Sequence, residues 1–342
     1  MKNLNILRIL MILASGFLFV QCTSDLEIPD PIAGPPGANG IDGIDGTDGV
    51  DGTASCVACH SNATREPIFA SFEVSSHNTG GSFARGSSAS CAQCHGEQGY
   101  IDYVETGMVD TAGYASPAPM SCVTCHDRHS TFDFENDGVD YALRSVGPVT
   151  LVIDNSTVLD FGDASNNCIT CHQPRNSYPV PGGTDSVTIT SSRYGPHHGP
   201  QTTMLEGIMA SNIPGSEAYP AVGTAAHRTG SSCVACHMGE SSDTSKGLHS
   251  WVPTEAACVQ CHPNGVADEM AGFTQDFETL RDLLVAEGAL TPTGSAVPGT
   301  FSAEVGQATW NYRTILEDNS RGIHNPGYTR ALLKNSIEAL QD

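Results

Sequence analysis

The chain has 342 residues and a formal net charge of −23, and 39% of its residues are hydrophobic. So acidic a chain repels nucleic acid and anionic lipid, which excludes binding to either as its main function, and it attracts cationic partners such as metal ions or basic redox proteins. A simpler alternative is that the charge only keeps an exported protein soluble. The low hydrophobic fraction, with 36 glycines and 20 prolines, predicts long irregular segments.

Residues 1–22 are typical of an export signal. Two basic residues precede an apolar run, residues 9–20, which is too short for a membrane span and ends near Cys22. The segment before Cys22 is similar to a bacterial lipoprotein cleavage site, although Gln21 stands where a small residue is usual. We therefore predict a lipid anchor at Cys22, on the periplasmic or cell-surface side, with ordinary secretion and a stray cysteine as the alternative.

Residues 23–53 are predicted to be a linker. Glycine occupies every third position from 34 to 52, which is the pattern of a collagen-like Gly-X-Y repeat. Only the triplet 34–36 carries the prolines that stabilise a triple helix, and aspartates in the later triplets would repel one another across three strands. An extended stalk is therefore favoured, while trimerisation and calcium binding by the aspartates remain alternatives.

Six Cys-x-x-Cys-His motifs lie within residues 54–262, and each is typical of a c-type haem attachment site. The two thiols can form thioethers to the vinyl groups on one porphyrin edge, and the following imidazole can bind the iron. We number the motifs in chain order: motif one has Cys56, Cys59 and His60; motif two Cys91, Cys94 and His95; motif three Cys122, Cys125 and His126; motif four Cys168, Cys171 and His172; motif five Cys233, Cys236 and His237; motif six Cys258, Cys261 and His262.

The twelve cysteines have two other interpretations. An exported protein could pair them in disulfides, and sets of four ligands could hold zinc. Neither alternative explains why histidine follows the second cysteine in every motif. The pattern therefore predicts six covalently bound haem c groups.

The predicted fold is mainly irregular, with short α-helices and a small β element around six closely packed haems, and it ends in a helical region, residues 266–342. Residues 149–153, 157–161 and 186–190 are rich in β-branched side chains and flank motif four, so they predict the β element. The cytochrome domain is predicted to span residues 54–342.

Three helices are predicted in the C-terminal region. The first carries apolar side chains at 273, 277, 280 and 284, which form one face of a helix. The second covers residues 303–317. The third begins at Asn325 and Pro326, because asparagine is a good N-cap and proline suits the first helical position.

Seven histidines lie outside the motifs, a number that favours a second histidine on each of six irons. His129 follows motif three too closely to bind the same iron, so a neighbouring haem is expected. His197 and His198 would point in opposite directions in an extended chain and so bridge two haems, and one of them is the expected spare. The candidate distal ligands are His77, His129, His197, His198, His227, His249 and His324.

Two further segments resemble exported multihaem c-type cytochromes of bacteria. They are Tyr-Gly-Pro-His-His-Gly-Pro-Gln at 194–201, and Trp-Asn-Tyr at 310–312 followed by Arg-Gly-Ile-His-Asn-Pro at 321–326. With the motifs, the resemblance covers roughly residues 54–342. It implies assembly outside the cytoplasm and assigns His324, in the His-Asn-Pro turn, as a distal ligand. The collagen-like linker departs from the family pattern.

These features predict an electron carrier, not an enzyme, with no catalytic residue. Histidine on both sides of an iron leaves no position for substrate, and the resemblance implies a role in anaerobic or extracellular respiration. The expected partners are other redox proteins or extracellular electron acceptors, and a homo-oligomer is possible. One alternative is a nitrite, hydroxylamine or tetrathionate reductase with one open haem, although no Cys-x-x-Cys-Lys motif is present. Another is a cytochrome-filament subunit.

Overall fold

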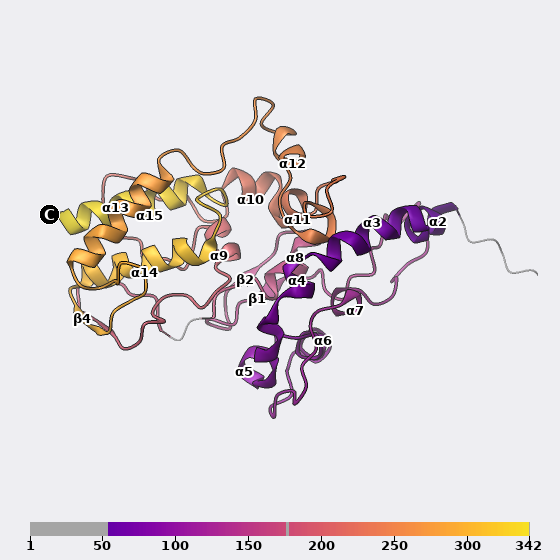
Figure 1. Ribbon diagram of the computed structural model, residues 1–342, viewed down its shortest axis with the longest axis horizontal. Helices are drawn as coiled ribbons and strands as arrows, with labels where there is room; N and C mark the ends of the chain where they lie inside the picture. The colour runs from indigo at the N-terminus through magenta and orange to yellow at the C-terminus, as the bar shows by residue number, and fades with distance from the viewer. Residues whose placement is uncertain (1–53, 176–177, 342) are drawn as a thin grey trace, which may run out of the picture. The chain divides into compact units, whose positions relative to one another are not determined.

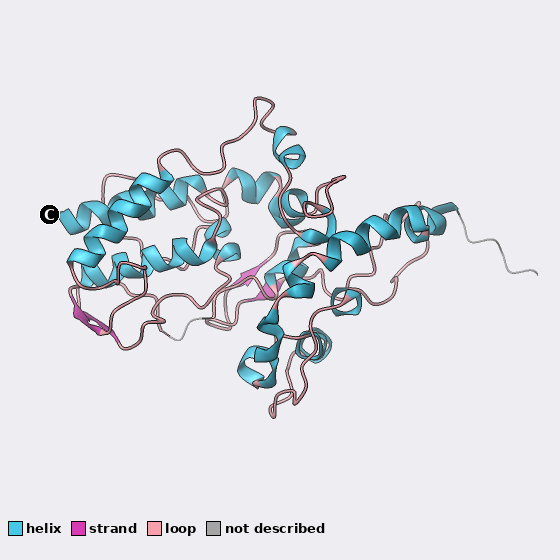
Figure 2. Ribbon diagram, in the orientation of Figure 1, coloured by secondary structure: helices cyan, strands magenta, loops and turns pink. Residues whose placement is uncertain are grey.

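The computed structural model describes residues 54–175 and 178–341, which are mainly irregular with many short helices, as the sequence predicts, and which form two small sheets (Figures 1 and 2). The predicted export signal, Cys22 and the Gly-X-Y linker lie outside the described residues. No helix in the described part of the chain combines the length and hydropathy needed to cross a bilayer.

Sixteen of the described elements precede residue 265. In chain order they are α2 (Ala54–His60), α3 (Asn62–Glu73), α4 (Ser76–Thr79), η1 (Gly81–Ser87), α5 (Ala89–Ala92), α6 (Glu97–Thr106), α7 (Cys122–Cys125), β1 (Val149–Thr150), β2 (Val158–Leu159), α8 (Ser165–Ile169), β3 (Val187–Ile189), α9 (Gln201–Glu206), α10 (Ala226–Gly230), α11 (Ser232–His237) and η2 (Leu248–Ser250), followed by α12 (Glu255–Val259). The C-terminal region holds α13 (Phe273–Ala286), β4 (Gly299–Phe301), α14 (Ala303–Asp318) and α15 (Pro326–Gln341).

Every motif begins in a short helix, namely α2, α5, α7, α8, α11 or α12. In motifs two, three, four and six, the histidine amide donates to the carbonyl of the first cysteine at 2.9–3.0 Å, which is the bond of one α-helical turn. This turn brings the two thiols and the imidazole to the same side of the helix. Isolated helices of so few residues are marginal in water, so tertiary contacts must hold them.

The three predicted strands form, but they do not form one sheet. β1 and β2 pair antiparallel, with Val149 opposite Leu159. β3 pairs instead with β4, so that Val187 lies opposite Phe301 in the C-terminal region. Helix α14 packs closely on β3 at Gly306, where a Cβ atom would lie 2.3 Å from Val187 Cβ.

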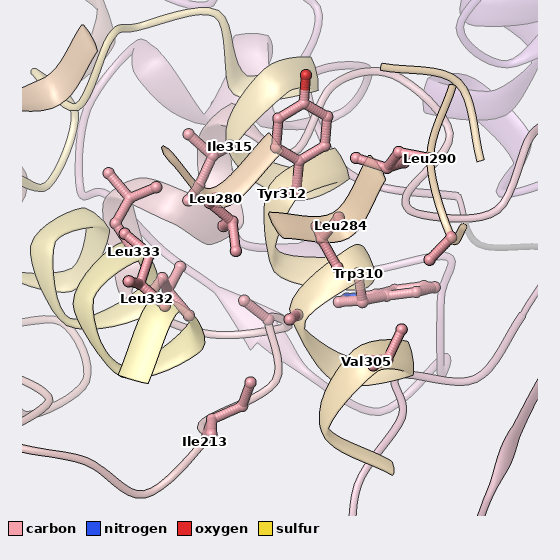
Figure 3. Packing of buried hydrophobic residues seen from close by; sticks show 14 of the residues in the cluster. Ile213, Leu280, Leu284, Leu290, Val305, Trp310, Tyr312, Ile315, Leu332 and Leu333 are labelled. Atoms are coloured by element: carbon pink, nitrogen blue, oxygen red, sulfur yellow. The ribbon is translucent and has the colours of Figure 1, made fainter. Parts of the chain in front are cut away.

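Helices α13, α14 and α15 begin and end close to the predicted positions and contact one another around the main core (Figure 1). Ser302 Oγ accepts from the Val305 amide at 3.4 Å, and Asn325 Oδ1 accepts from the Tyr328 amide at 3.0 Å, so both predicted starts are capped. Figure 3 shows the core side chains converging between these helices. The largest is Trp310, which is fully buried.

A second apolar cluster supports motif four. Ile169 of α8 is fully buried in a cluster with Val149 of β1, Leu159 of β2 and Phe161, which follows β2. The guanidinium of Arg228 in α10 lies 3.9 Å from the Phe161 ring centroid and pairs with Glu206 Oε2 at 2.7 Å. Both side chains of this pair are mostly buried, and the pair orients the Arg228 guanidinium over the Phe161 ring.

Candidate haem sites

Five of the six motif histidines face the ring of one predicted distal histidine. In every pair, the ring centroids are 6.0–6.3 Å apart. Each site takes the number of its motif. The pairs are His60 with His129 at 6.0 Å (site one), His126 with His249 at 6.2 Å (site three), His172 with His77 at 6.1 Å (site four), His237 with His324 at 6.3 Å (site five) and His262 with His227 at 6.1 Å (site six).

The separation fits an iron held between two imidazoles. A metal–nitrogen bond is about 2 Å long and the ring centroid lies about 1 Å beyond the nitrogen, so two such rings have centroids about 6 Å apart. Rings that pack directly on each other span a wider range, about 4.5–7 Å. Five recurrences within 6.0–6.3 Å, each beside a cysteine pair, therefore fit axial ligation of haem.

The cysteines are also in a state that suits thioether formation. The motif cysteines from Cys59 to Cys261 carry free thiols, which gives no support to a disulfide framework among the described residues. Within the same residues, no group of three or more His, Cys, Asp and Glu side chains is arranged to hold a bare metal ion.

Site two differs from the others. His95 lies in a cavity of about 560 Å³ that His197 and His198 also line, together with Arg175. No single ring stands opposite His95 at the separation of the other pairs among the described histidines. The Nδ1 atom of His198 is 2.6 Å from Glu317 Oε2, and the His198 side chain is 70% exposed. The structure therefore brings both adjacent histidines to the same site.

The expectation that His197 and His198 point in opposite directions is wrong. Their ring centroids are only 4.6 Å apart. His198 has a φ of +26°, outside the extended region, and positive-φ glycines flank the pair at 195 and 199. This turn, not an extended strand, sets the directions of the two side chains.

Motif two contacts motif four. Gln93 Nε2 donates to the Thr170 carbonyl at 3.1 Å, and Cys171 Sγ lies 3.6 Å from the Gln93 carbonyl. Gln93, between the cysteines of motif two, thus contacts both Thr170 and Cys171 of motif four. The phenol of Tyr100, on the helix after motif two, also donates to Asn167 beside motif four.

Motif four contacts motif five on another side. Ser165 Oγ is 2.9 Å from Ser232 Oγ, and it accepts from the Val234 amide at 3.1 Å. These residues belong to α8 and α11, which carry the cysteines of motifs four and five. Motif four therefore lies between motifs two and five and ties their helices together.

Backbone carbonyls orient several of the paired imidazoles. The Nδ1 atoms of His126, His129 and His237 lie 2.8–2.9 Å from carbonyl oxygens, and that of His227 lies 2.5 Å from one. Because a carbonyl only accepts, Nδ1 of these rings carries the proton and Nε2 keeps its lone pair. The opposite nitrogen is then free to bind iron.

Burial holds several of the rings in the neutral form. Burial first, and then the charges of His172 and His249, lower the pKa of His77 to about 4. Burial and a neighbouring motif histidine lower the pKa of His249 to about 4 as well. Burial is also the main cause of the lowered pKa values of His172 and His237. Imidazole binds metal only when neutral, so these rings suit iron at neutral pH.

Two residues at the sites were not predicted from the sequence. The Trp251 ring lies 4.3 Å from that of His77 and 5.3 Å from that of His249, and its carbonyl accepts from His237 Nδ1. Asp318 Oδ1 lies 2.7 Å from His324 Nδ1. Burial acts to lower the pKa of His324, but the charge of Asp318 and the hydrogen bond outweigh it and raise that pKa. For Trp251, the sequence signal that could have indicated this role is its position two residues after the candidate ligand His249.

Comparison with known proteins gives one informative likeness. No protein-family model and no curated protein matches the chain. Among solved structures, the chain is similar to outer cell wall cytochrome OcwA, with a TM-score of 0.50 and 18% sequence identity over 80% of this chain. The match covers 50% of the OcwA chain, so this chain spans about half its length. The described chain therefore has a cytochrome fold.

Proposed function

We propose that the chain binds six haem c groups covalently, one at each motif, and transfers electrons between redox partners outside the cytoplasm. The five imidazole pairs with centroids 6.0–6.3 Å apart carry this proposal. When bound, haem supplies reversible one-electron chemistry at its iron. The cytochrome fold supports the same function.

In this proposal the side chains of each site have distinct roles. The two cysteines of a motif would hold the haem covalently, and the motif histidine and its paired ring would bind its iron. At sites one, three, four, five and six, the iron would then have no position left for a substrate. The protein thus orients and buries its cofactors and keeps substrates away from the metal, which suits electron transfer and opposes bond-making chemistry.

The contacts between motifs support transfer along an array. Motif four meets motif two through Gln93 and Thr170, and it meets motif five through Ser165 and Ser232. His126 and His129 come from one short segment but belong to sites three and one. The protein segments that hold different cofactors are therefore in direct contact.

Site two favours a second candidate function, reduction of a small substrate. His95 has no single opposing ring, and its cavity is also lined by His197, His198 and Arg175, together with the paired rings of site four. A reductase needs one haem whose sixth position is open. In the electron-carrier proposal, His197 or His198 fills that position.

Carbon monoxide binding to the reduced holoprotein separates the two candidates. An electron carrier with six axially saturated haems is expected to show no change in its Soret spectrum under carbon monoxide. Binding of one carbon monoxide per chain would instead establish an open site and favour the reductase.

The His129→Ala variant serves as the positive control for that measurement. The ring of His129 is partly buried and stands opposite His60, so its removal should open site one and allow one carbon monoxide to bind. If the His129→Ala variant keeps all its haems and its Soret spectrum does not change under carbon monoxide, His129 is not an iron ligand.

We further propose that Cys22 is lipidated and that residues 23–53 form a stalk that holds the cytochrome domain away from a membrane. The similar cytochrome is described as an outer cell wall protein, which supports a location outside the cytoplasm. The net charge of −23 suits cationic redox partners, because opposite charge steers their encounter with the protein.

A further inference from the structure

The imidazole of His324 has a partner unlike those of the other paired rings. Its Nδ1 atom lies 2.7 Å from Asp318 Oδ1, whereas Nδ1 of His126, His129 and His237 meets neutral backbone carbonyls. The Asp318 side chain is only 2% exposed, so water screens its charge little. Site five therefore has a buried negative charge bonded directly to one of its rings.

Asp318 is held in place by its position in the chain. It is the last residue of α14, and Asn319, with a φ of 57°, ends the helix and starts the turn that leads to His324. The Ser320 hydroxyl donates to Asp318 Oδ2, so the other oxygen faces the imidazole. The carboxylate is thus fixed toward the ring.

His249 at site three has the opposite environment. Its Nδ1 atom is buried and has no hydrogen-bond partner, although its backbone amide donates to Ser71 Oγ at 3.1 Å. Because Nδ1 is enclosed by protein, Nε2 is the nitrogen that remains to face a metal. No acceptor in the described structure forms a hydrogen bond with Nδ1 of this ring.

These two environments change the donor strength of imidazole in opposite directions. A ring that donates to a carboxylate gains electron density at its other nitrogen and becomes a stronger ligand. A stronger donor stabilises the ferric over the ferrous state and lowers the reduction potential, while a ring without an acceptor is a weaker donor. The hydrogen-bond partner of an axial ligand is one of the protein's means of setting a haem potential.

We propose that Asp318 is a positioning residue that sets site five to a lower reduction potential than site three. The inference rests on the proposed function, since it requires iron between the paired rings. The difference favours net movement of electrons from site five, in the C-terminal half, toward site three, and so gives the array a direction.

The Asp318→Asn variant of the full holoprotein tests this inference. The amide oxygen can still accept from His324 Nδ1, so the ring stays oriented while the charge is lost. A redox titration, monitored by visible absorption, is expected to show that one of the six reduction potentials is higher than in the wild type. The expected rise in potential corresponds to a change of about tenfold in the reduction equilibrium constant, which is about 59 mV for a one-electron couple. Six unchanged potentials would overturn the inference.

Two further variants complete the design. Asp282→Asn makes the same change in charge at a side chain that is 69% exposed, and it should leave all six potentials unchanged. Ser320→Ala removes the hydroxyl that fixes the Asp318 carboxylate toward the imidazole, so the potential of the same haem should rise, by less than in Asp318→Asn. If Asp318→Asn does not load its haems, Ser320→Ala tests the inference instead. An unchanged potential in Ser320→Ala would then contradict the inference.

Failure of this inference is distinguishable from failure of the proposed function. Mass and spin state of the wild-type holoprotein are measured first. Fewer than six haems, or a five-coordinate iron at site five, contradicts the function itself. Six low-spin haems whose potentials do not respond to Asp318→Asn contradict only the role of Asp318.

Discussion

Replacing Cys168 and Cys171 together by alanine is expected to prevent stable folding of the cytochrome domain, beyond the loss of one haem. Motif four contacts motif two through the Thr170 carbonyl and motif five through Ser165, and Ile169 anchors it in the second apolar cluster. An unfilled site at this junction leaves a large cavity. We expect the free energy of unfolding to fall by more than about 4 kcal/mol, measured by thermal or denaturant unfolding.

The matched control is the Cys56→Ala and Cys59→Ala double variant. Motif one lies at the start of the described chain, and Cys59 is exposed. This variant should fold with one haem fewer by intact mass and keep the spectra of the other sites. Equal losses of stability in the two double variants would contradict the central position of motif four.

Replacing Trp310 by alanine is expected to destabilise the C-terminal helices by about 3–5 kcal/mol. The indole is fully buried, its Nε1 donates to the Met209 carbonyl at 3.1 Å, and its ring meets that of Tyr194 at 5.4 Å. Since α14 ends at Asp318, the damage should reach site five. Circular dichroism is expected to show a melting temperature lowered by roughly 10 °C for such a loss.

Glu304→Ala on the same helix is the control for that variant. Glu304 is exposed in the first turn of α14, so its loss should cost less than about 1 kcal/mol. A melting temperature that barely moves in Trp310→Ala would show that α14 is not anchored by this core.

The C-terminal helices could be predicted from the sequence because their signals are local. The spacing of Phe273, Leu280 and Leu284 defines the buried face of α13, and Asn325 caps α15 through a bond to an amide three residues later. Strands β1 and β2 are separated by a short turn, so their pairing is local as well. β3 was predicted, but its partner β4 was not, because the two lie more than a hundred residues apart.

The pairing of histidines could not be predicted for the same reason. The motifs identify one half of each site from five consecutive residues. The second ring comes from distant chain, as with His77 opposite His172 and His126 opposite His249. At His197 and His198 the extended-chain assumption was wrong, because a positive φ at His198 turns the second ring toward the first.

Asp318 has no signal in the sequence that marks it. It is one of 38 acidic residues, and most carboxylates lie on protein surfaces. Only its burial at the end of α14 and its 2.7 Å contact with His324 distinguish it. Such a role depends on the fold of the α14–α15 connection and becomes visible only in three dimensions.

Electron paramagnetic resonance of the oxidised holoprotein tests the central claim most directly. The account predicts that integration of the spectrum gives six low-spin ferric haems per chain and no stoichiometric high-spin signal, since five motif histidines face a second imidazole and His197 or His198 is proposed to serve His95. A high-spin signal equal to one haem per chain, or low-spin signals that account for four haems or fewer, would contradict it.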